Sequence, residues 1–323
     1  MVSVASFFDL VEQDLNQLTE NVKNLVGAKH QVLRLAAEYL FEAGGKRIRP
    51  ALVLLMARAT SPSGEPTEKH RRLAEITEMI HTASLVHDDV IDVADVRRGA
   101  ETVNSLFGNK VAVLAGDFLF AKSSIYLARL GSLEVVELLA TVIDHLAEGE
   151  MLQIKNHFDS TLAFDEYIEK SFYKTASLMA NSCRAAAVLS DMPEELCEAA
   201  YNYGRHVGIA FQVVDDLLDF TSSTETLGKP AASDLRQGHI TAPVLFALEE
   251  FPELSALIQR EFKQDGDIEQ ALAWVKKSQG LIRTKELAHQ HIKHAILAVE
   301  KFPASPARQA MIDLTDYVLK RVF

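Results

Sequence analysis

The sequence predicts an all-α protein in which the chain folds into one large helical bundle. Long segments such as residues 30–45 and 134–158 place apolar side chains three and four positions apart, the spacing of helices with one buried face. Alternating strand patterns are scarce. The chain has no repeat and no shift in composition, so we expect a single domain over residues 1–323.

Two sequence signals predict helix starts. Ser305 followed by Pro306 is typical of a start, because the missing N–H of proline would be unpaired in the first turn anyway. Asp191, with Glu194 three residues later, matches a capping box. Residues 221–243 are polar and rich in small side chains, which is typical of a long loop that is either a lid or disordered.

Composition narrows the possible partners and compartment. Of the 323 residues, 48% are hydrophobic, enough for a sizeable core, and the net charge of −12 disfavours nucleic acid and anionic membranes as main partners. Two cysteines provide no disulfide framework and fit a reducing compartment. The first residues lack the features of a signal peptide, and no run of about 18 uninterrupted apolar residues occurs. We expect a cytoplasmic protein without a transmembrane segment.

Three aspartates interrupt an aliphatic segment, SLVHDDVIDVADVRRG (84–99). On a helix, Asp88 and Asp92 share one face with His81 and Ser84, while Asp89 lies beside them. Most of the surrounding residues are apolar, so this helix carries one polar stripe. A half-buried helix with a solvated acidic edge is the alternative interpretation.

The pattern recurs in GIAFQVVDDLLDF (208–220), where Gln212, Asp215 and Asp219 share a face and Asp216 lies beside them. Two copies of D-D-x-x-D weaken the alternative, because burying unpaired carboxylates costs several kcal/mol per ion. Mg²⁺ neutralises carboxylates while keeping water and phosphate oxygens as its other ligands. Two such helices facing a cavity would hold a magnesium diphosphate.

Basic residues occur near both acidic segments and in the long loop. Arginine binds phosphate oxygens in pairs and lysine supplies a point charge. We interpret Arg47 as a surface cation and His87 as a satisfied core histidine. The candidate diphosphate ligands are Lys46, Arg49, Arg97, Arg98, Lys174 with Thr175, and Lys229.

Five motifs in this order resemble the trans-isoprenyl diphosphate synthases. They are GGKRIRP (44–50), HDDVID followed by RRG (87–99), YKTA (173–176), FQVVDDLLDF (211–220) and LGKP (227–230). The resemblance extends from about residue 30 to the end of the chain. The sequence of residues 78–99 is most similar to that of the long-chain branch, and within this branch to that of the solanesyl-type enzymes of photosynthetic organisms.

The resemblance implies the isoprenoid synthase fold around a central cavity, and a prenyltransferase that joins isopentenyl diphosphate head-to-tail to allylic diphosphates. It implies two to three Mg²⁺ ions on Asp88, Asp89, Asp92, Asp215 and Asp219, with Asp216 as a further contact beside the motif ends. It places the allylic diphosphate on Arg97, Lys174, Thr175, Gln212 and Lys229, and isopentenyl diphosphate on Lys46, Arg49, His81 and Arg98. The residues expected to be catalytic are Asp88, Asp92, Asp215, Lys174 and Arg97.

Product length is expected to depend on Ala83 and Ser84. In the family, bulky aromatics at these positions accompany short products. Helical period places Ser84 on the face of Asp88 but does not place Ala83 there, so the role of Ala83 rests on the resemblance. Two small residues predict an open tunnel and a product of about forty to fifty carbons, with the solanesyl length favoured, for quinone side chains. Close helix packing is the alternative reason for their size.

Other assignments stay open at this level. A shorter-chain geranylgeranyl or farnesyl diphosphate synthase, a class I terpene cyclase, a non-catalytic partner subunit and a helical structural protein are the alternatives. The second D-D-x-x-D and GGKRIRP argue against a cyclase, and two intact aspartate motifs argue against a silent subunit. His239 stands where many members carry lysine, so no diphosphate contact is transferred to it. The resemblance also implies a homodimer and leaves open a peripheral membrane contact during product release.

Overall fold

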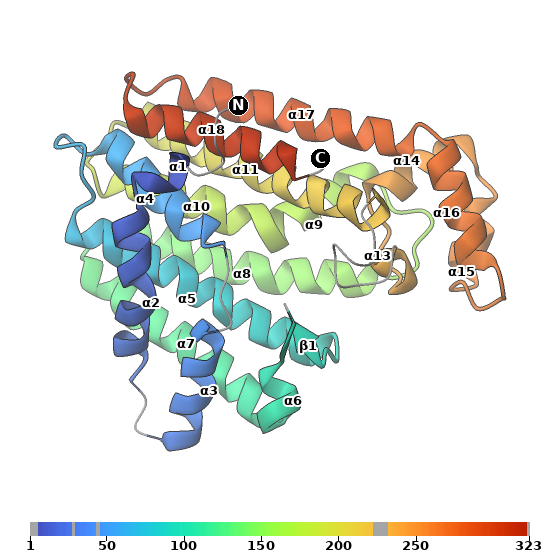
Figure 1. Cartoon of the computed structure of the whole chain (residues 1–323), viewed down its shortest axis with the longest axis horizontal. Helices are drawn as coiled ribbons and strands as arrows, with labels where there is room; N and C mark the ends of the chain where they lie inside the picture. The colour runs from blue at the N-terminus through green and yellow to red at the C-terminus, as the bar shows by residue number, and fades with distance from the viewer. Residues whose placement is uncertain (1–5, 28–29, 43–45, 98, 222–231, 322–323) are drawn as a thin grey trace. The chain divides into compact units, whose positions relative to one another are not determined.

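Helices build most of the chain, as predicted, in the computed structural model, which describes residues 6–27, 30–42, 46–97, 99–221 and 232–321 (Figure 1). Within these ranges the strands are β1 (Val96–Arg97) and β2 (Ala100–Glu101), which pair antiparallel directly after the first aspartate motif. The all-α prediction is confirmed.

The helices of the first half are α1 (Ser6–Asp9), α2 (Glu12–Val26), α3 (Gln31–Glu42), α4 (Ile48–Thr60), α5 (Glu68–Ile91), α6 (Val103–Phe107), α7 (Asn109–Leu130) and α8 (Leu133–Lys155). Those that follow are α9 (Phe164–Ser171), the π-helix η1 (Phe172–Ala176), α10 (Ser177–Val188), α11 (Glu194–Thr221), α13 (Ser233–Arg236), α14 (Ala242–Glu250), α15 (Leu254–Gln259), α16 (Asp267–Lys277), α17 (Gly280–Val299) and α18 (Pro306–Lys320).

The chain divides into two compact units, each built from three segments. Unit 1 comprises Met1–Ile143, Leu178–Tyr201 and Val299–Asp313, and unit 2 comprises Asp144–Ser177, Asn202–Ala298 and Leu314–Phe323. The expectation of one domain over residues 1–323 therefore stays a prediction.

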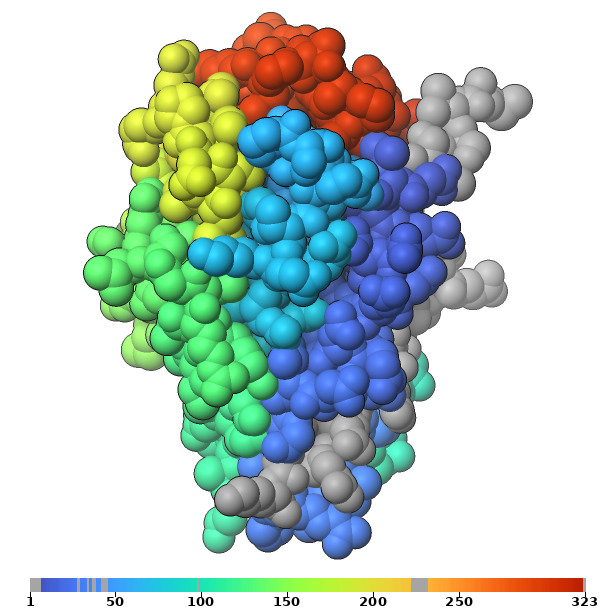
Figure 2. All heavy atoms as spheres, turned by 90° about the vertical axis from the view of Figure 1, so that its left-hand side faces the viewer, coloured from blue at the N-terminus to red at the C-terminus, as the bar shows by residue number. Residues whose placement is uncertain are grey.

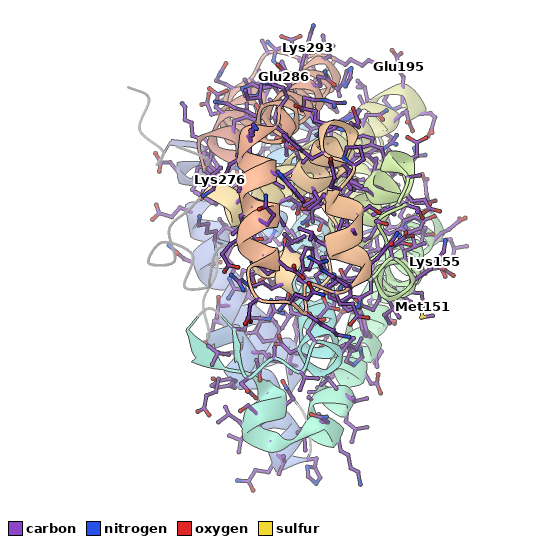
Figure 3. All side chains as sticks on the ribbon, turned by 90° about the vertical axis from the view of Figure 1, so that its right-hand side faces the viewer. Met151, Lys155, Glu195, Lys276, Glu286 and Lys293 are labelled. Carbon is purple, nitrogen blue, oxygen red and sulfur yellow. The ribbon has the colours of Figure 1, made fainter. Side chains whose placement is uncertain are left out.

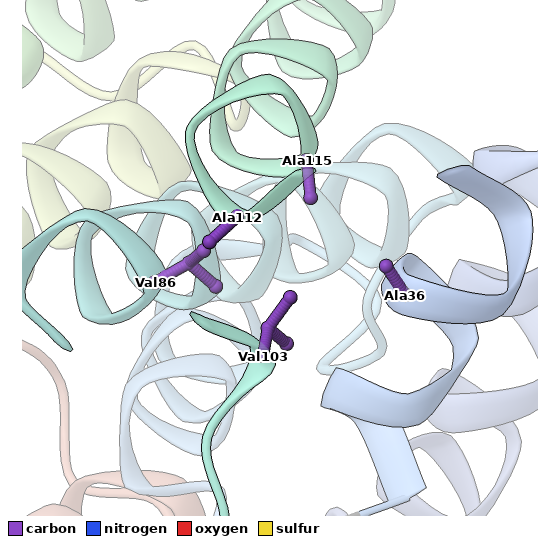
Figure 4. Packing of buried hydrophobic residues seen from close by; sticks show 5 residues of the cluster. All are labelled: Ala36, Val86, Val103, Ala112 and Ala115. Atoms are coloured by element: carbon purple, nitrogen blue, oxygen red, sulfur yellow. The ribbon is translucent and has the colours of Figure 1, made fainter. Parts of the chain in front are cut away.

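Unit 1 is organised by α5, which packs against α4 and α7 (Figure 1). A small cluster of buried residues joins α3, α5, α6 and α7 near the end of α5 that carries the first aspartates (Figure 4). Small side chains allow these backbones to approach closely, so the packing fixes that end of α5. The cluster consists of Ala36, Val86, Val103, Ala112 and Ala115.

Distant segments of unit 1 meet on the face seen in Figure 2, where the α4–α5 connection, the start of α8 and the turn before α11 lie together. Polar contacts join them beneath the surface: Thr60 Oγ1 lies 2.9 Å from Ser190 Oγ, and His70 Nε2 lies 3.1 Å from the Ala186 carbonyl oxygen. Burial lowers the pKa of His70, so this contact is made by a neutral imidazole.

The helix α7 is long and apolar enough to cross a membrane by length and composition, although no such span was expected. A third of its most apolar window (33%) is buried in the fold, where it packs along α5. Core helices of soluble proteins meet the same criterion, so composition alone does not place α7 in lipid. Its exposed apolar residues include Val113, Leu114 and Ile125.

In unit 2, the helix α14 packs against α9, α15 and α16. Aromatic rings support this packing, with the Phe164 and Phe246 centroids 5.2 Å apart. On the outer surface, Met151 and Lys155 project from α8 and Lys293 from α17 (Figure 3). Glu150, which precedes Met151 on α8, is buried instead.

The helix boundaries test the sequence signals. The start at Pro306 is confirmed, and Ser305 Oγ accepts the N–H of Arg308 at 3.1 Å. The start predicted at Asp191 is wrong: Asp191 adopts a left-handed conformation that closes the preceding helix, and its N–H donates to the Val188 carbonyl at 3.0 Å. Pro193 takes the capping position before α11, because its carbonyl accepts from Leu196 and Cys197.

A pH-sensitive contact in unit 2 generates a stability prediction. His206 of α11 and His291 of α17 lie with their Nδ1 atoms 2.9 Å apart, and His294 and Arg205 lie nearby. Burial, followed by repulsion from these neighbours, lowers the pKa of both His206 and His291 to about 4 from the usual 6.5.

Because the unfolded chain binds more protons between pH 6.5 and 4, the free energy of unfolding should fall as pH drops through this range. His206→Gln should reduce that loss by about 1 kcal/mol between pH 7 and pH 5, measured by urea unfolding. His289→Gln, an exposed change on α17, is the control. An identical loss in both variants and in the wild type would contradict this assignment.

Candidate active site

A π-helical turn positions two of the predicted diphosphate ligands. In η1 the N–H of Ser177 donates to the Phe172 carbonyl, five residues back, and Lys174 and Thr175 lie within this turn. Single π turns inside helical segments occur frequently at functional sites, because they re-aim side chains that a regular helix would place elsewhere.

Two glycines make room for the π turn. A Cβ on Gly149 of α8 would lie 2.8 Å from Lys174 Cγ, and one on Gly208 of α11 would lie 2.5 Å from Ala176 Cα. Both distances are shorter than van der Waals contact allows, so α8 and α11 approach η1 only because these positions lack a side chain. Lys174 then donates to Glu150 of α8, with Nζ and Oε2 2.5 Å apart.

A buried hydrogen-bond network joins η1 to the second aspartate motif. Thr175 Oγ1 donates to Gln212 Oε1 at 2.7 Å, Gln212 Nε2 donates to Asp216 Oδ1 at 2.8 Å, and the Tyr167 hydroxyl donates to Asp216 Oδ2 at 2.6 Å. Asp216 is 1% exposed, and burial raises its pKa to about 6 although Tyr167 and Gln212 act in the opposite direction. Because both of its carboxylate oxygens accept hydrogen bonds, Asp216 fixes the position of Gln212 and, through it, of Thr175.

The two ends of this motif differ in their surroundings. Asp215 is half-buried, and its Oδ1 accepts a hydrogen bond from Arg321 Nη2 at 2.5 Å. Asp219 is buried, and its two oxygens accept the backbone N–H groups of Ser233 and Asp234, both at 3.1 Å. Asp219 therefore caps α13 and ties residues 232–234 to the end of α11.

The prediction of a loop over residues 221–243 is wrong for the last part of that range, which contains α13 and the start of α14.

The first aspartate motif closes α5 in unit 1. Asp88 is half-buried, whereas Asp92 is the exposed C-cap residue of α5, and its N–H donates to the Asp88 carbonyl at 2.8 Å. Asp89 is buried, and Arg97 Nε donates to its Oδ1 at 2.7 Å. Burial raises the pKa of Asp89, while Arg97 opposes that shift. The hairpin of β1 and β2 carries Arg97 back over the motif.

Residues predicted to bind isopentenyl diphosphate lie partly together. Arg49 Nη1 lies 3.1 Å from His81 Nε2, which joins the start of α4 to α5, and Lys46 is exposed just before α4. A hollow of unit 1 is lined by His81, Asp89 and Arg97 among others. The structure therefore brings predicted contacts to both substrates into one unit.

The interpretation of Arg47 as a surface cation is wrong. Arg47 forms an ion pair with Glu78 of α5 and donates to the Phe41 carbonyl at 3.2 Å, with only 15% of its side chain exposed. Half-buried charges of this kind are paired because an isolated one would lose its hydration without compensation. His87 is hydrogen-bonded as predicted, with its Nε2 3.0 Å from the Val113 carbonyl oxygen, but it is half-buried and does not lie in the core.

The chain-length candidates lie on α5 with different exposure. Ala83 is fully buried, whereas Ser84 is half-buried and its hydroxyl donates to the His81 carbonyl at 2.8 Å. Two further candidates, Arg98 and Lys229, lie outside the described residues. Sequence reasoning missed Glu150, Tyr167 and Arg321, whose positions become significant only through the partners that the fold supplies.

Comparison with known proteins decides the family. The polyprenyl synthetase family model matches residues 30–275. The chain belongs to this family. A prenyl transferase of Synechocystis sp. is 59% identical with both chains covered fully, and chloroplastic solanesyl diphosphate synthase 1 of Arabidopsis thaliana is 50% identical over 99% of this chain and 80% of that relative.

Solved structures agree with this membership. A decaprenyl diphosphate synthase from Rhodobacter capsulatus has a TM-score of 0.92 at 35% identity, covering 99% of this chain and 100% of that one. A polyprenyl synthase from Caulobacter crescentus, complexed with calcium and isoprenyl diphosphate, has a TM-score of 0.91 at 34% identity and covers 99% and 98%. This polyprenyl synthetase is therefore a trans-prenyltransferase with the isoprenoid synthase fold that its sequence predicts.

Arg47 and Arg49 have different contacts, so we expect one substitution to affect stability and the other to affect substrate binding. Arg47→Ala should lower the free energy of unfolding by about 3 kcal/mol, because it leaves Glu78 buried without its partner. Arg49→Ala should instead raise the KM for isopentenyl diphosphate while changing stability little. Urea unfolding and initial rates on both variants test this. A similar loss of stability in both, with unchanged KM, would show that the two arginines share a structural role.

Proposed function

We propose that this prenyltransferase is a solanesyl-type synthase, which adds isopentenyl diphosphate repeatedly to an allylic diphosphate and makes an all-trans product of about forty-five carbons. The observation that carries this proposal is the 50% identity to a solanesyl diphosphate synthase over nearly the whole chain. Small residues at positions 83 and 84 support a long product. Quinone side chains are the proposed use of that product.

The aspartates that fit magnesium best are Asp88, Asp92 and Asp215. Asp92 is exposed, and Asp88 and Asp215 are half-buried, so a hydrated ion has access to all three. Their carboxylates supply the oxygen ligands that Mg²⁺ requires. Asp89 and Asp219 also belong to the proposed ligand set. Their oxygens accept hydrogen bonds from Arg97 and from backbone N–H groups, as Oδ1 of Asp215 accepts one from Arg321. Bound magnesium, two to three ions in this proposal, would supply positive charge for the departing diphosphate.

The chain's own residues would do the remaining work. Lys174, Thr175 and Gln212, together with Arg97, would bind the allylic diphosphate, and Lys46, Arg49 and His81 would hold isopentenyl diphosphate. Charge on the leaving diphosphate develops where these cations and donors point, which lowers the barrier to ionisation. The isopentenyl double bond then attacks the allylic carbocation, and the released diphosphate takes the proton. Water must be kept from this carbocation. The lid expected at residues 221–243 lies partly outside the described residues, which omit 222–231.

The aspartate assignment has a direct test. Asp88→Ala and Asp215→Ala should each reduce turnover in magnesium at least about a hundredfold while leaving the helical circular dichroism unchanged. Asp95→Ala removes one exposed carboxylate from the turn after the first motif and serves as the charge-matched control. Near wild-type turnover in either motif variant would overturn the magnesium proposal.

Product length is tested more cleanly at Ser84 than at Ala83. Ala83 is fully buried, so Ala83→Phe would add strain of about 1–3 kcal/mol to the core. Ser84→Phe should block the growing tail and give products of about fifteen to twenty carbons with little loss of the first condensation rate. Ser84→Ala should keep the wild-type length. Mass analysis of products from farnesyl and labelled isopentenyl diphosphates would contradict the proposal if the wild type stopped at twenty carbons.

We also propose a cytoplasmic homodimer whose contact includes α7, with at most a peripheral membrane contact as product leaves. Leu114 of α7 is 60% exposed and lies close to exposed Val113, and apolar surface of this kind is stabilised by a partner. Leu114→Glu should shift the protein toward monomer in light scattering after size exclusion, whereas Lys110→Glu, a polar change on the same helix, should not. A dimer unaffected by Leu114→Glu would exclude this surface.

A further inference from the structure

The last described residue of the chain lies on the second aspartate motif. Within unit 2, Arg321 follows the end of α18, and its Nη2 lies 2.5 Å from Asp215 Oδ1. Its Cζ lies 4.1 Å from the ring centroid of Phe211, one helical turn before Asp215. Arg321 is therefore held by a carboxylate and an aromatic face of the same helix, α11.

This contact is incomplete for an arginine. A guanidinium usually pairs with a carboxylate through two parallel hydrogen bonds, but here a single nitrogen reaches a single oxygen. The other terminal nitrogen, Nη1, is buried and has no hydrogen-bond partner among the described residues. A buried donor without a partner costs free energy, so the arrangement holds Arg321 in place without fully satisfying it.

Asp215 is the carboxylate of this motif for which two cations would compete. The guanidinium supplies the opposite charge beside the one carboxylate of this motif that remains 37% exposed and open to solvent. Magnesium and Arg321 would therefore compete for Oδ1 of the same carboxylate.

We propose that Arg321 is a resident cation that occupies Asp215 in the metal-free enzyme and is displaced from it when the divalent ion binds. This inference rests on the proposed magnesium site at Asp215. Arg321 is a positioning residue in this account: it orients Asp215, and it raises the metal concentration that the site requires. Once displaced, its charge stays on the short C-terminal segment near the motif.

Binding of Mn²⁺ in the absence of substrates tests this directly, with free Mn²⁺ followed by electron paramagnetic resonance. Removing the competitor in Arg321→Ala should tighten Mn²⁺ binding about three- to tenfold. Lys320→Ala is the matched control, because it removes the same charge from the preceding position, where the Nζ of Lys320 lies 3.9 Å from Asp316. Its effect should be less than about twofold, as expected for an exposed charge in salt.

A third variant distinguishes direct competition for Asp215 from a long-range electrostatic effect of the arginine charge on the metal. In an Asp215→Asn background, Arg321→Ala should no longer tighten Mn²⁺ binding, because the shared ligand is gone. Unchanged or weaker binding in Arg321→Ala with intact Asp215, or the same gain in Lys320→Ala, would overturn the inference. If Asp215→Asn does not weaken Mn²⁺ binding at all, the magnesium site itself fails. Thermal unfolding of each variant confirms that the fold persists.

Discussion

Carboxylates set into apolar helices are the constraint on which this structure depends. Asp216 is buried with a raised pKa, and it is tolerated because Tyr167 and Gln212 donate to both of its oxygens. The same network orders Thr175 on the π turn. The hydrogen bonds that stabilise the buried carboxylate therefore also fix the positions of the residues that donate them.

In the first motif, an arginine and not a set of neutral donors stabilises the buried carboxylate. Buried Asp89 is paired with Arg97, which the short hairpin after α5 returns to it. Asp88 and Asp92 are more exposed. The first motif thus commits Asp89 to the protein, and the second commits both Asp216 and Asp219. In each motif at least one aspartate keeps access to solvent. This division explains how an apolar helix can present acidic ligands without losing the packing that holds it.

Helical periodicity predicted the fold class correctly, because a buried stripe of apolar residues is a local property of the sequence. The family resemblance, and not periodicity, grouped Thr175 with Gln212, and the structure joins the two by a hydrogen bond. The error at Arg47 depends on a tertiary neighbour, because the sequence does not show that Glu78 lies beside it. The error at Asp191 is local: Pro193, two positions later, takes the capping position instead. Arg321 carries no signal in the sequence, since its partner lies more than a hundred positions away.

The π turn also constrains how this region can change in length. A π turn accommodates one residue more than a regular helical turn, so η1 resembles a one-residue insertion between α9 and α10. Deleting a single residue among positions 172–174 would allow a continuous α-helix to form, and it would rotate Thr175 by about 100° away from Gln212. Substitutions at these positions change one side chain, whereas a deletion would redirect several at once. The number of residues before Thr175 is therefore as much a part of the site as their identity.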